Sequence, residues 1–145
     1  MEVRPYSPND RAACLGLFDS NRPHYFTDEE RGQFEAFLAA PSGSYYVLEN
    51  DGDLLGCGGF VGESEVGLVK LIWGLVRHDL HRRGLGKFLL FYRLREIGKL
   101  AGMTMVRVET AEHTVGFFER AGGFRVVTQE PDGRVTMVKK LAVCA

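Results

Sequence analysis

The sequence predicts an α/β protein with one mixed sheet, and three observations point to this class. Two apolar runs flank Asn50-Asp51-Gly52-Asp53, a pattern that predicts a β-hairpin. Further along, a buried strand, a short basic loop with two glycines and a long helix follow one another. The element order of the chain is β-α-α-β-β-β-α-β-α-β-β, in which a three-stranded antiparallel start precedes a β-α-β crossover. The expected sheet is mostly antiparallel, with about seven strands, and about four helices flank it.

The first half of the chain is expected to hold a short strand, two helices and the hairpin. Ser7-Pro8 supplies a capping residue and a first-turn proline for the first helix, which ends at Asn21-Arg22-Pro23. Thr27 and Glu30 form a capping box for the second helix, which breaks at Pro41. The strands of this half are expected at residues 2–5, 45–49 and 54–60.

The second half is expected to hold the crossover and a second hairpin. A long helix runs from Gly84 to about Ala101, and a short one from Thr114 to Arg120. Apolar residues on two sides predict that the first half of the long helix is buried nearly all round: Leu85, Phe88, Leu89, Leu90 and Tyr92. The strands are expected at residues 66–76, 105–110, 124–129 and 134–141.

Composition indicates a globular protein and argues against several classes. The 145 residues are 45% hydrophobic and 26% charged, which is ordinary for a folded domain. A formal net charge of −1 disfavours a nucleic-acid partner, and three widely separated cysteines suit a reducing compartment. No apolar run approaches the ~20 residues of a membrane span, and no signal peptide is recognisable. We therefore expect a soluble cytoplasmic protein with no membrane partner, folded as a single domain over residues 1–145.

The segment from Leu68 to Leu90 indicates a phosphate site. Gly84 and Gly86 stand where the strand gives way to the helix, so backbone N–H groups face one point at the positive end of the helix dipole. Four side chains add donors around this point: His81, Arg82, Arg83 and Lys87. A solvated basic loop is the alternative for the two arginines, but their place before the glycines favours phosphate contact.

Two common nucleotide loops do not fit this segment. A dinucleotide fingerprint requires a third glycine where Leu89 stands. A P-loop requires glycine at the position of His81, and serine or threonine at that of Phe88. His78 and His81 have the i, i+3 spacing of metal ligands, but the sequence offers no third ligand nearby, so we expect no metal.

The glycine loop resembles a motif of the GNAT N-acetyltransferase family. The run His81-Arg82-Arg83-Gly84-Leu85-Gly86 is similar to that family's coenzyme A pyrophosphate loop, Q/R-x-x-G-x-G/A, with histidine in the first position. The element order of nearly the whole chain is also that of the GNAT fold. The resemblance implies a GNAT-like sheet in which the fourth and fifth strands splay apart.

A later run also resembles that family. The segment Phe117–Phe124 is similar to the motif A-x-x-[FL]-Y-E-[RK]-x-G-F, which Glu119-Arg120 matches. It departs from the motif at Phe118, where the family has tyrosine, and by one extra residue in Ala121-Gly122-Gly123. Ala111 stands where the family commonly has asparagine.

The resemblance implies acetyl-coenzyme A as acyl donor, with no metal, and a primary amine as acceptor. The pantetheine arm would add to the free edge of the fourth strand, at Gly74, Leu75 and Val76. A backbone N–H of Leu75 or Val76 would stabilise the oxyanion of the thioester. The residues expected to hold the donor are Leu75, Val76, His81, Arg82, Arg83, Gly84, Leu85, Gly86, Lys87 and Phe118.

The implied reaction is direct attack by a neutral amine, and it requires a general base because an alkylammonium has a pKa of ~10.4. The candidates at the carboxyl end of the fifth strand are Glu109, Glu112 and His113, of which we rank His113 first and Glu109 second. A sheet-end ion pair is the alternative for Glu109, and a helix cap for His113. Phe118 cannot protonate the leaving thiolate, as the family tyrosine is thought to do. A thiolate of pKa ~8.5 leaves readily, so water or His113 is expected to suffice.

The acceptor is expected to lie against the connection between the first two helices. Asn21 and Tyr25 there, with Trp73 at the splay, are the substrate candidates, although a core role is an equal alternative for Trp73. Asp19 would hold an ammonium group and Arg22 a carboxylate, with a plain surface loop as the alternative. The mixture suits a small molecule or a peptide terminus.

Two other functions stay open at this point. Phe118 and Ala111 favour a catalytically impaired acyl-coenzyme A-binding or sensing domain. A nucleotide-binding protein with an atypical loop is disfavoured by the two failed fingerprints. Many such folds dimerise through their last strands, so a homodimer is a further open alternative.

Overall fold

The computed structural model describes residues 1–21 and 26–141, and in them it has the predicted order of elements. The strands are β1 (Glu2–Pro5), β2 (Ser44–Asn50), β3 (Asp53–Glu63), β4 (Leu68–Val76), β5 (Met105–Ala111), β6 (Arg125–Gln129) and β7 (Arg134–Lys140). The α-helices are α1 (Arg11–Asn21), α2 (Asp28–Ala39), α3 (Leu85–Ile97) and α4 (Val115–Phe117). Shorter helical turns are η1 (Pro8–Asp10), η2 (His78–Leu80), η3 (Glu112–Thr114) and η4 (Phe118–Gly122). The predicted fold class is confirmed.

The seven strands are joined in the order β1-β2-β3-β4-β5-β7-β6. The β1–β2, β5–β7 and β6–β7 ladders are antiparallel, whereas β4 and β5 are parallel, as the crossover predicts. The parallel ladder joins only Leu68–Lys70 to Met105–Arg107. In the part of the chain that the structure describes, Leu71–Val76 of β4 have no register partner on β5, so the pairing of the two strands ends early.

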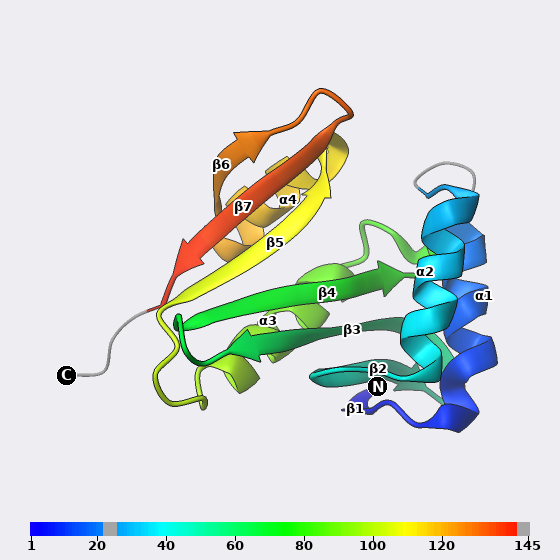
Figure 1. Ribbon diagram of the computed structural model, residues 1–145. Coiled ribbons are helices and arrows are strands. Elements are labelled where there is room, and N and C mark those ends of the chain that lie inside the picture. The colour runs from blue at the N-terminus through cyan, green and yellow to red at the C-terminus, as the bar shows by residue number, and fades with distance from the viewer. Residues whose placement is uncertain (22–25, 142–145) are drawn as a thin grey trace. The chain divides into compact units, whose positions relative to one another are not determined.

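The chain forms two compact units. The first unit comprises Met1–Gly59 and Trp73–Tyr92, and the second comprises Phe60–Ile72 and Arg93–Ala145. In the first unit, α1 and α2 lie together, and their rings Phe18 and Phe34 stack with centroids 5.6 Å apart (Figure 1). In the second unit, β5, β7 and β6 run side by side, and α4 lies in the connection from β5 to β6 (Figure 1). The expectation of a single domain stays a prediction.

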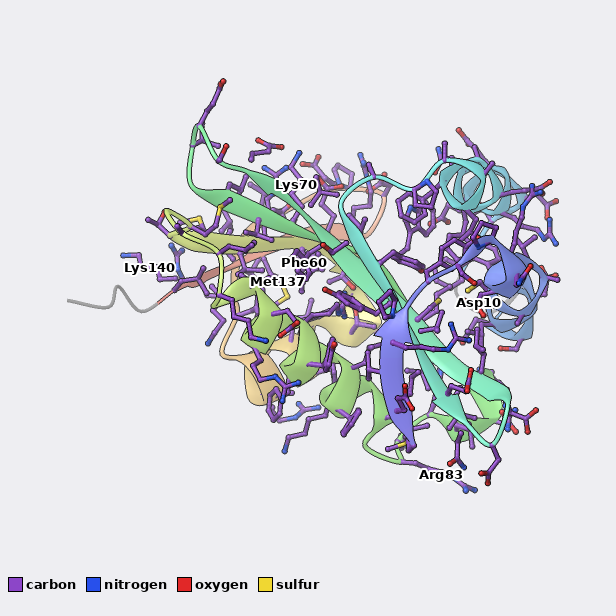
Figure 2. The ribbon with its side chains drawn as sticks, turned by 90° about the horizontal axis from the view of Figure 1, so that it is seen from below. Asp10, Phe60, Lys70, Arg83, Met137 and Lys140 are labelled. Atoms are coloured by element: carbon purple, nitrogen blue, oxygen red, sulfur yellow. The ribbon has the colours of Figure 1, made fainter. Side chains whose placement is uncertain are left out.

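A partly buried ion cluster fixes the start of the first unit. The guanidinium of Arg4 on β1 donates to both carboxylate oxygens of Asp10, at 2.8 and 2.9 Å, and to Glu49 of β2. Asp10, labelled in Figure 2, has a side chain only 8% exposed. The hydrogen bonds from Arg4 lower the pKa of Asp10, so this pair stabilises the fold above the unfolded pKa of Asp10. That stabilisation is lost as the pH falls through the lower folded value.

The capping box predicted for the second helix is confirmed. The backbone N–H of Glu30 donates to the hydroxyl of Thr27 at 3.1 Å, and the backbone N–H of Thr27 donates to the carboxylate of Glu30 at 3.1 Å. These two bonds satisfy N–H groups that have no partner inside the helix. They fix where α2 begins.

The long helix differs from its prediction in burial and length. Phe88 is 43% exposed and Phe91 46% exposed, so the prediction that its first half is buried nearly all round is wrong. Leu89, Leu90 and Ile97 form the buried side. Apolar residues on two sides of a helix do not reveal which side becomes buried on folding, and in α3 only one side is buried. The helix ends at Ile97, four residues before the predicted end at Ala101.

The short helix predicted from Thr114 to Arg120 is a series of three different turns. A 3₁₀ turn at Glu112–Thr114 leads into α4, which continues as the π-turn Phe118–Gly122. A π-turn accommodates one residue more than an α-turn. It therefore lies where the sequence carries one extra residue relative to the GNAT motif.

Candidate active site

The loop before α3 has the backbone that a phosphate site requires. Arg82 has φ +66° and Gly84 has φ +80°, both in the left-handed region. The N–H of Phe88 donates to the carbonyl of Gly84 at 3.0 Å, so the hydrogen bonds of α3 begin at Gly84, the first glycine of the loop. The N–H groups of the first helical turn have no acceptor inside the helix and carry the positive end of its dipole.

The predicted phosphate donors surround this turn and are open to solvent. His81, Arg82, Arg83, Gly84 and Lys87 are exposed, and Figure 2 shows Arg83 at the outer edge of the loop. Leu85 and Gly86 are half-buried in the first turn of α3. A side chain built on Gly84 would have no atom within 4 Å, so the space above the loop is free for a ligand. These observations fit a pyrophosphate group.

Two side chains hold the end of β4, just before this loop, through the carbonyl of Val76. The amide of Asn21 on α1 donates to that oxygen at 3.0 Å, and Nε2 of His81 lies 2.9 Å from it. Asn21 is only 2% exposed and also donates to the carbonyl of Leu17 at 2.9 Å. The predicted substrate candidate Asn21 is therefore placed as an internal link between α1 and β4.

The backbone of β4 is irregular at Trp73. This residue has φ +43°, an uncommon conformation for a bulky side chain that costs of order 1–3 kcal/mol. The hydroxyl of Tyr45 on β2 donates to the carbonyl of Trp73 at 2.7 Å. The next residue, Gly74, is exposed, whereas Leu75 is 5% exposed. The strand therefore presents irregular, partly accessible backbone at the predicted thioester site.

Tyr45 reaches Trp73 because its surroundings fix the ring. Its centroid lies 5.0 Å from that of Phe37 and 5.8 Å from that of Tyr6, both in edge-on contacts. A Cβ at Gly59 would lie 2.1 Å from the carbonyl of Ser44 and 2.7 Å from the Tyr45 ring, so only glycine fits there. Tyr45 was not among the predicted site residues, because an aromatic residue on a predicted strand gives no sign of a hydrogen bond to a distant carbonyl.

The indole of Trp73 packs on the aromatic residues of α2. Its ring centroid lies 4.9 Å from that of Phe34 and 6.5 Å from that of Phe37. Trp73 is half-buried, so one part packs while another meets solvent. The second substrate candidate of this unit, Tyr25, lies outside the described residues, as does Arg22. Asp19 is paired with Arg31 at 2.8 Å.

The candidate bases lie in the second unit, at the end of β5. Glu109 is exposed on the strand, opposite Thr136 of β7. His113 is exposed in the turn η3, whose Thr114 hydroxyl donates to the carbonyl of Ala111 at 2.8 Å and also bonds to Thr110. Both candidates are therefore accessible from solvent.

A shallow depression of about 510 Å³ adjoins His113. It is lined by Ala111, Glu112, His113, Asp132 and Gly133. Glu112 accepts a hydrogen bond from Gln129 at 2.9 Å. The backbone N–H of Arg134 donates to Asp132 and, with the Arg134 side chain, lowers the pKa of that carboxyl. The depression therefore keeps an ionised carboxylate on one wall.

Phe118 begins the π-turn and is half-buried. Its ring makes edge-on contacts with Phe117 and Phe124, with centroids 5.2 and 5.5 Å away. The structure thus brings the cofactor loop, β4 backbone and Asn21 together in the first unit. Glu109, His113 and Phe118 lie in the second unit.

The described residues contain no group of three or more His, Cys, Asp or Glu side chains placed to hold a metal ion. None of the described helices is long and apolar enough to cross a membrane.

Comparison with known proteins identifies the family. The model of the acetyltransferase (GNAT) family matches residues 12–124. The chain belongs to this family of acetyltransferases, whose acyl donor is acetyl-coenzyme A. The family, the class of enzyme and the donor predicted from the two motifs are therefore confirmed. No curated protein sequence matches the chain.

Solved structures show the same fold at low sequence identity. An aminoglycoside 6′-N-acetyltransferase complexed with coenzyme A aligns with a TM-score of 0.79 and 15% identity, covering 100% of this chain and 99% of that one. A GNAT-family protein from Desulfovibrio desulfuricans gives 0.80 and 22%, covering 97% of each chain. The ribosomal-protein-S18-alanine N-acetyltransferase from Escherichia coli gives 0.78 and 16%, covering 99% of this chain and 96% of that one. At these identities the comparison establishes the fold.

Proposed function

We propose that the protein transfers the acetyl group of acetyl-coenzyme A to a primary amine of a small molecule or peptide, by direct attack in a ternary complex. The observation that carries this proposal is the loop before α3, in a chain of the GNAT family. Arg82 and Gly84 turn its backbone into the left-handed region, and four exposed basic side chains surround a helix N-terminus. Such a loop binds a pyrophosphate group.

The first unit would hold the donor. The pyrophosphate would accept hydrogen bonds from the amides of Gly84–Lys87 and from the arginines of the loop. The backbone of Leu75 and Val76 would bind the pantetheine arm as an added strand. An N–H at Leu75 or Val76 would stabilise the oxyanion, and Tyr45 would support this geometry through the Trp73 carbonyl. Asn21 would act by holding Val76.

The second unit would supply the base. Bound acetyl-coenzyme A supplies a thioester carbon that a neutral amine can attack. His113, the first candidate, would take the ammonium proton directly or through a water, and Glu109 is the second candidate. Both are exposed, which suits exchange of that proton with solvent. Phe118 would pack against the donor rather than act as an acid, and the low basicity of the thiolate would make an acid less necessary.

The proposed acceptor is a primary amine of a small molecule or a peptide. One structural neighbour is an aminoglycoside acetyltransferase and another acts on an alanine of a ribosomal protein, so the fold serves amines of different kinds. Trp73 and Tyr25 remain the proposed acceptor contacts in the first unit. Three cysteines that are odd in number and far apart in the sequence favour a reducing compartment, so the cytoplasm is the proposed location.

The experiment that tests this function is a thermal-shift comparison followed by an enzyme assay. Ligand at 100 times its dissociation constant adds about 2.7 kcal/mol to the stability of the folded state, which is several degrees in Tm. We expect acetyl-coenzyme A and coenzyme A to shift Tm, and ATP and NAD not to. Thiol release with an amine panel then measures transfer. The absence of any shift with coenzyme A would overturn the proposed site.

The second candidate function is an acyl-coenzyme A-binding domain with impaired catalysis. Phe118 favours it, because no hydroxyl stands where the family has its acid. A Tm shift with coenzyme A, combined with no thiol release across a broad amine panel, would support this alternative.

A further inference from the structure

One face of the sheet in the second unit carries cations on three of its strands. The β4–β5 ladder places Lys70 opposite Arg107. The next two ladders place Arg107 opposite Val138 of β7, and Val138 opposite Arg125 of β6. Residues opposite each other on neighbouring strands point to the same face, so Lys70, Arg107 and Arg125 lie in one line across the sheet. We call these three residues the cation row.

The three side chains of the cation row are each at least partly accessible to solvent. On the other face, Val106 and Met137 are fully buried. Figure 2 shows Lys70 and Met137 on opposite sides of the strands. Arg125 is exposed, Arg107 is half-buried, and the Lys70 side chain is 38% exposed. Val138, which lies between Arg107 and Arg125 in the same line, is only 6% exposed, so a ligand would meet the charged side chains rather than the strand at Val138.

The charges of the row are only partly balanced. Glu63 of β3 pairs with Lys70 at 2.7 Å, and attraction to Arg107 adds to the hydrogen bond from Lys70 in lowering the pKa of Glu63. Among the described residues, no ion pair holds Arg107 or Arg125. Glu63 therefore offsets part of the repulsion between Lys70 and Arg107, which lie opposite each other on β4 and β5. The positive charge of Arg125 has no such carboxylate partner among the ion pairs of the described residues.

A carboxylate follows the row on the same face. Glu109 is two residues beyond Arg107 on β5, which is about 6.7 Å along a strand. It is exposed and lies opposite Thr136. The face therefore offers three cations and, about 7 Å further along β5, the carboxylate of Glu109, the second candidate base.

We propose that the cation row binds an anionic group of the acceptor, so that the substrate is a small amine that also carries a carboxylate or phosphate. This inference rests on the proposed acetyltransferase function. The anion of the substrate sits against Arg107 and Arg125, and its amine end lies toward Glu109. Opposite charges at the two ends fix the direction in which the acceptor binds. A polycation, such as the aminoglycoside of a structural neighbour, brings like charge to the row.

The test compares matched acceptors that differ only at the end away from the amine. Thiol release is measured with 6-aminohexanoate, 6-aminohexyl phosphate, hexylamine and 1,6-diaminohexane. We expect kcat/KM for at least one anionic acceptor to exceed that for hexylamine about tenfold or more, and 1,6-diaminohexane to be the poorest. Equal use of hexylamine, or preference for the diamine, would overturn the proposal. The two anionic probes decide between carboxylate and phosphate.

Substitutions in the cation row test whether it causes the preference for anionic acceptors. In Arg107→Gln and Arg125→Gln, we expect the preference for the anionic acceptor to fall about tenfold, mainly through KM, with kcat for hexylamine retained. Lys139→Gln is the matched control, because Lys139 belongs to β7 but alternates to the other face. An unchanged preference in both arginine variants would contradict the assignment. Coenzyme A-induced Tm shifts verify that each variant folds and binds the donor.

A measurement of acceptor binding distinguishes failure of this inference from failure of the proposed acetyltransferase function. Calorimetry with the protein saturated with coenzyme A measures binding of 6-aminohexanoate, 6-aminohexyl phosphate and hexylamine without turnover. Binding of an anionic probe that Arg107→Gln weakens supports the row even where no amine is acetylated. If no anionic probe binds to a protein that coenzyme A stabilises, this inference is wrong, while the proposed donor site is still supported.

Discussion

The end of β4 in the first unit and the end of β5 in the second carry the two halves of the proposed reaction, and they are held very differently. At the end of β4, buried or half-buried side chains fix single carbonyl groups: Asn21 holds Val76, and Tyr45 holds Trp73. At the end of β5, Glu109 and His113 are both exposed. The proposed donor-binding backbone is therefore held by buried side chains, whereas the proposed proton-transfer groups are open to solvent.

This difference follows from what each half must do. An oxyanion and a pantetheine arm are bound by backbone groups, which must be oriented before the ligand arrives. A base must exchange its proton with water in every cycle, so exposure suits it. The cost of the first arrangement is visible in the positive φ of Trp73, which the neighbouring Tyr45 hydrogen bond helps to hold.

The largest effect is expected at the second region. His113→Ala should lower kcat about 10²–10⁴-fold if His113 is the base, with the Tm shift by coenzyme A unchanged. Glu109→Gln and Glu112→Gln are the matched controls from the same strand end, and we expect losses below tenfold. The measurement is steady-state thiol release at saturating donor. A larger loss in Glu109→Gln than in His113→Ala would reverse the ranking of the two bases.

The next effect concerns the donor loop. The double variant Arg82→Gln/Arg83→Gln should weaken acetyl-coenzyme A binding about 10–100-fold, because it removes charge-assisted hydrogen bonds to the pyrophosphate. Both side chains are exposed, so Tm without ligand should stay the same. Titration calorimetry measures the change. Lys99→Gln removes a cation beyond the other end of α3, and an equal loss in that variant would point to general charge rather than to the loop.

A smaller effect should come from the hydrogen bond between Tyr45 and the Trp73 carbonyl in the first region. Tyr45→Phe deletes the hydrogen bond to Trp73 and should lower the free energy of unfolding by about 1 kcal/mol. It should also lower kcat several-fold with little change in donor affinity, because the oxyanion site loses its fixed geometry. Tyr6→Phe is the matched control, since its hydroxyl likewise donates to a backbone carbonyl, that of Leu38, at 3.2 Å. Equal kcat in the two variants would leave Tyr45 with a structural role alone.

The same contrast explains how far the sequence could predict the molecule. The hairpin at Asp51-Gly52, the capping box at Thr27 and the strand boundaries depend on neighbours in the chain, and they were predicted within a few residues. The burial of Phe88 was not, because two apolar sides of one helix compete and tertiary packing chooses between them. The π-turn at Phe118 was visible only as an extra residue in the late motif.

The candidate site divides in the same way. The proposed cofactor loop is local in sequence, so a local pattern is enough to predict the residues from His81 to Lys87 together. The roles of Asn21 and Tyr45 depend on hydrogen bonds to residues 55 and 28 positions away, which no local pattern reveals. The cation row likewise needs the strand register, since Lys70, Arg107 and Arg125 are far apart in the chain.

The smallest effect is expected where the family motif and this chain differ most. Phe118→Tyr restores the hydroxyl that the motif predicts, and we expect kcat to stay unchanged or to rise slightly, because the leaving thiolate needs little help from an acid. The Phe118 residue is only half-buried and its ring makes edge-on contacts with Phe117 and Phe124, so we expect the variant to keep its Tm. Kinetics and the coenzyme A-induced Tm shift are measured together.

A large rise in kcat would show that the wild-type chain lacks an acid it needs and would favour the impaired binding domain. A large loss of donor affinity at constant Tm would instead assign Phe118 to packing on the donor, and with it a cofactor contact in the second unit.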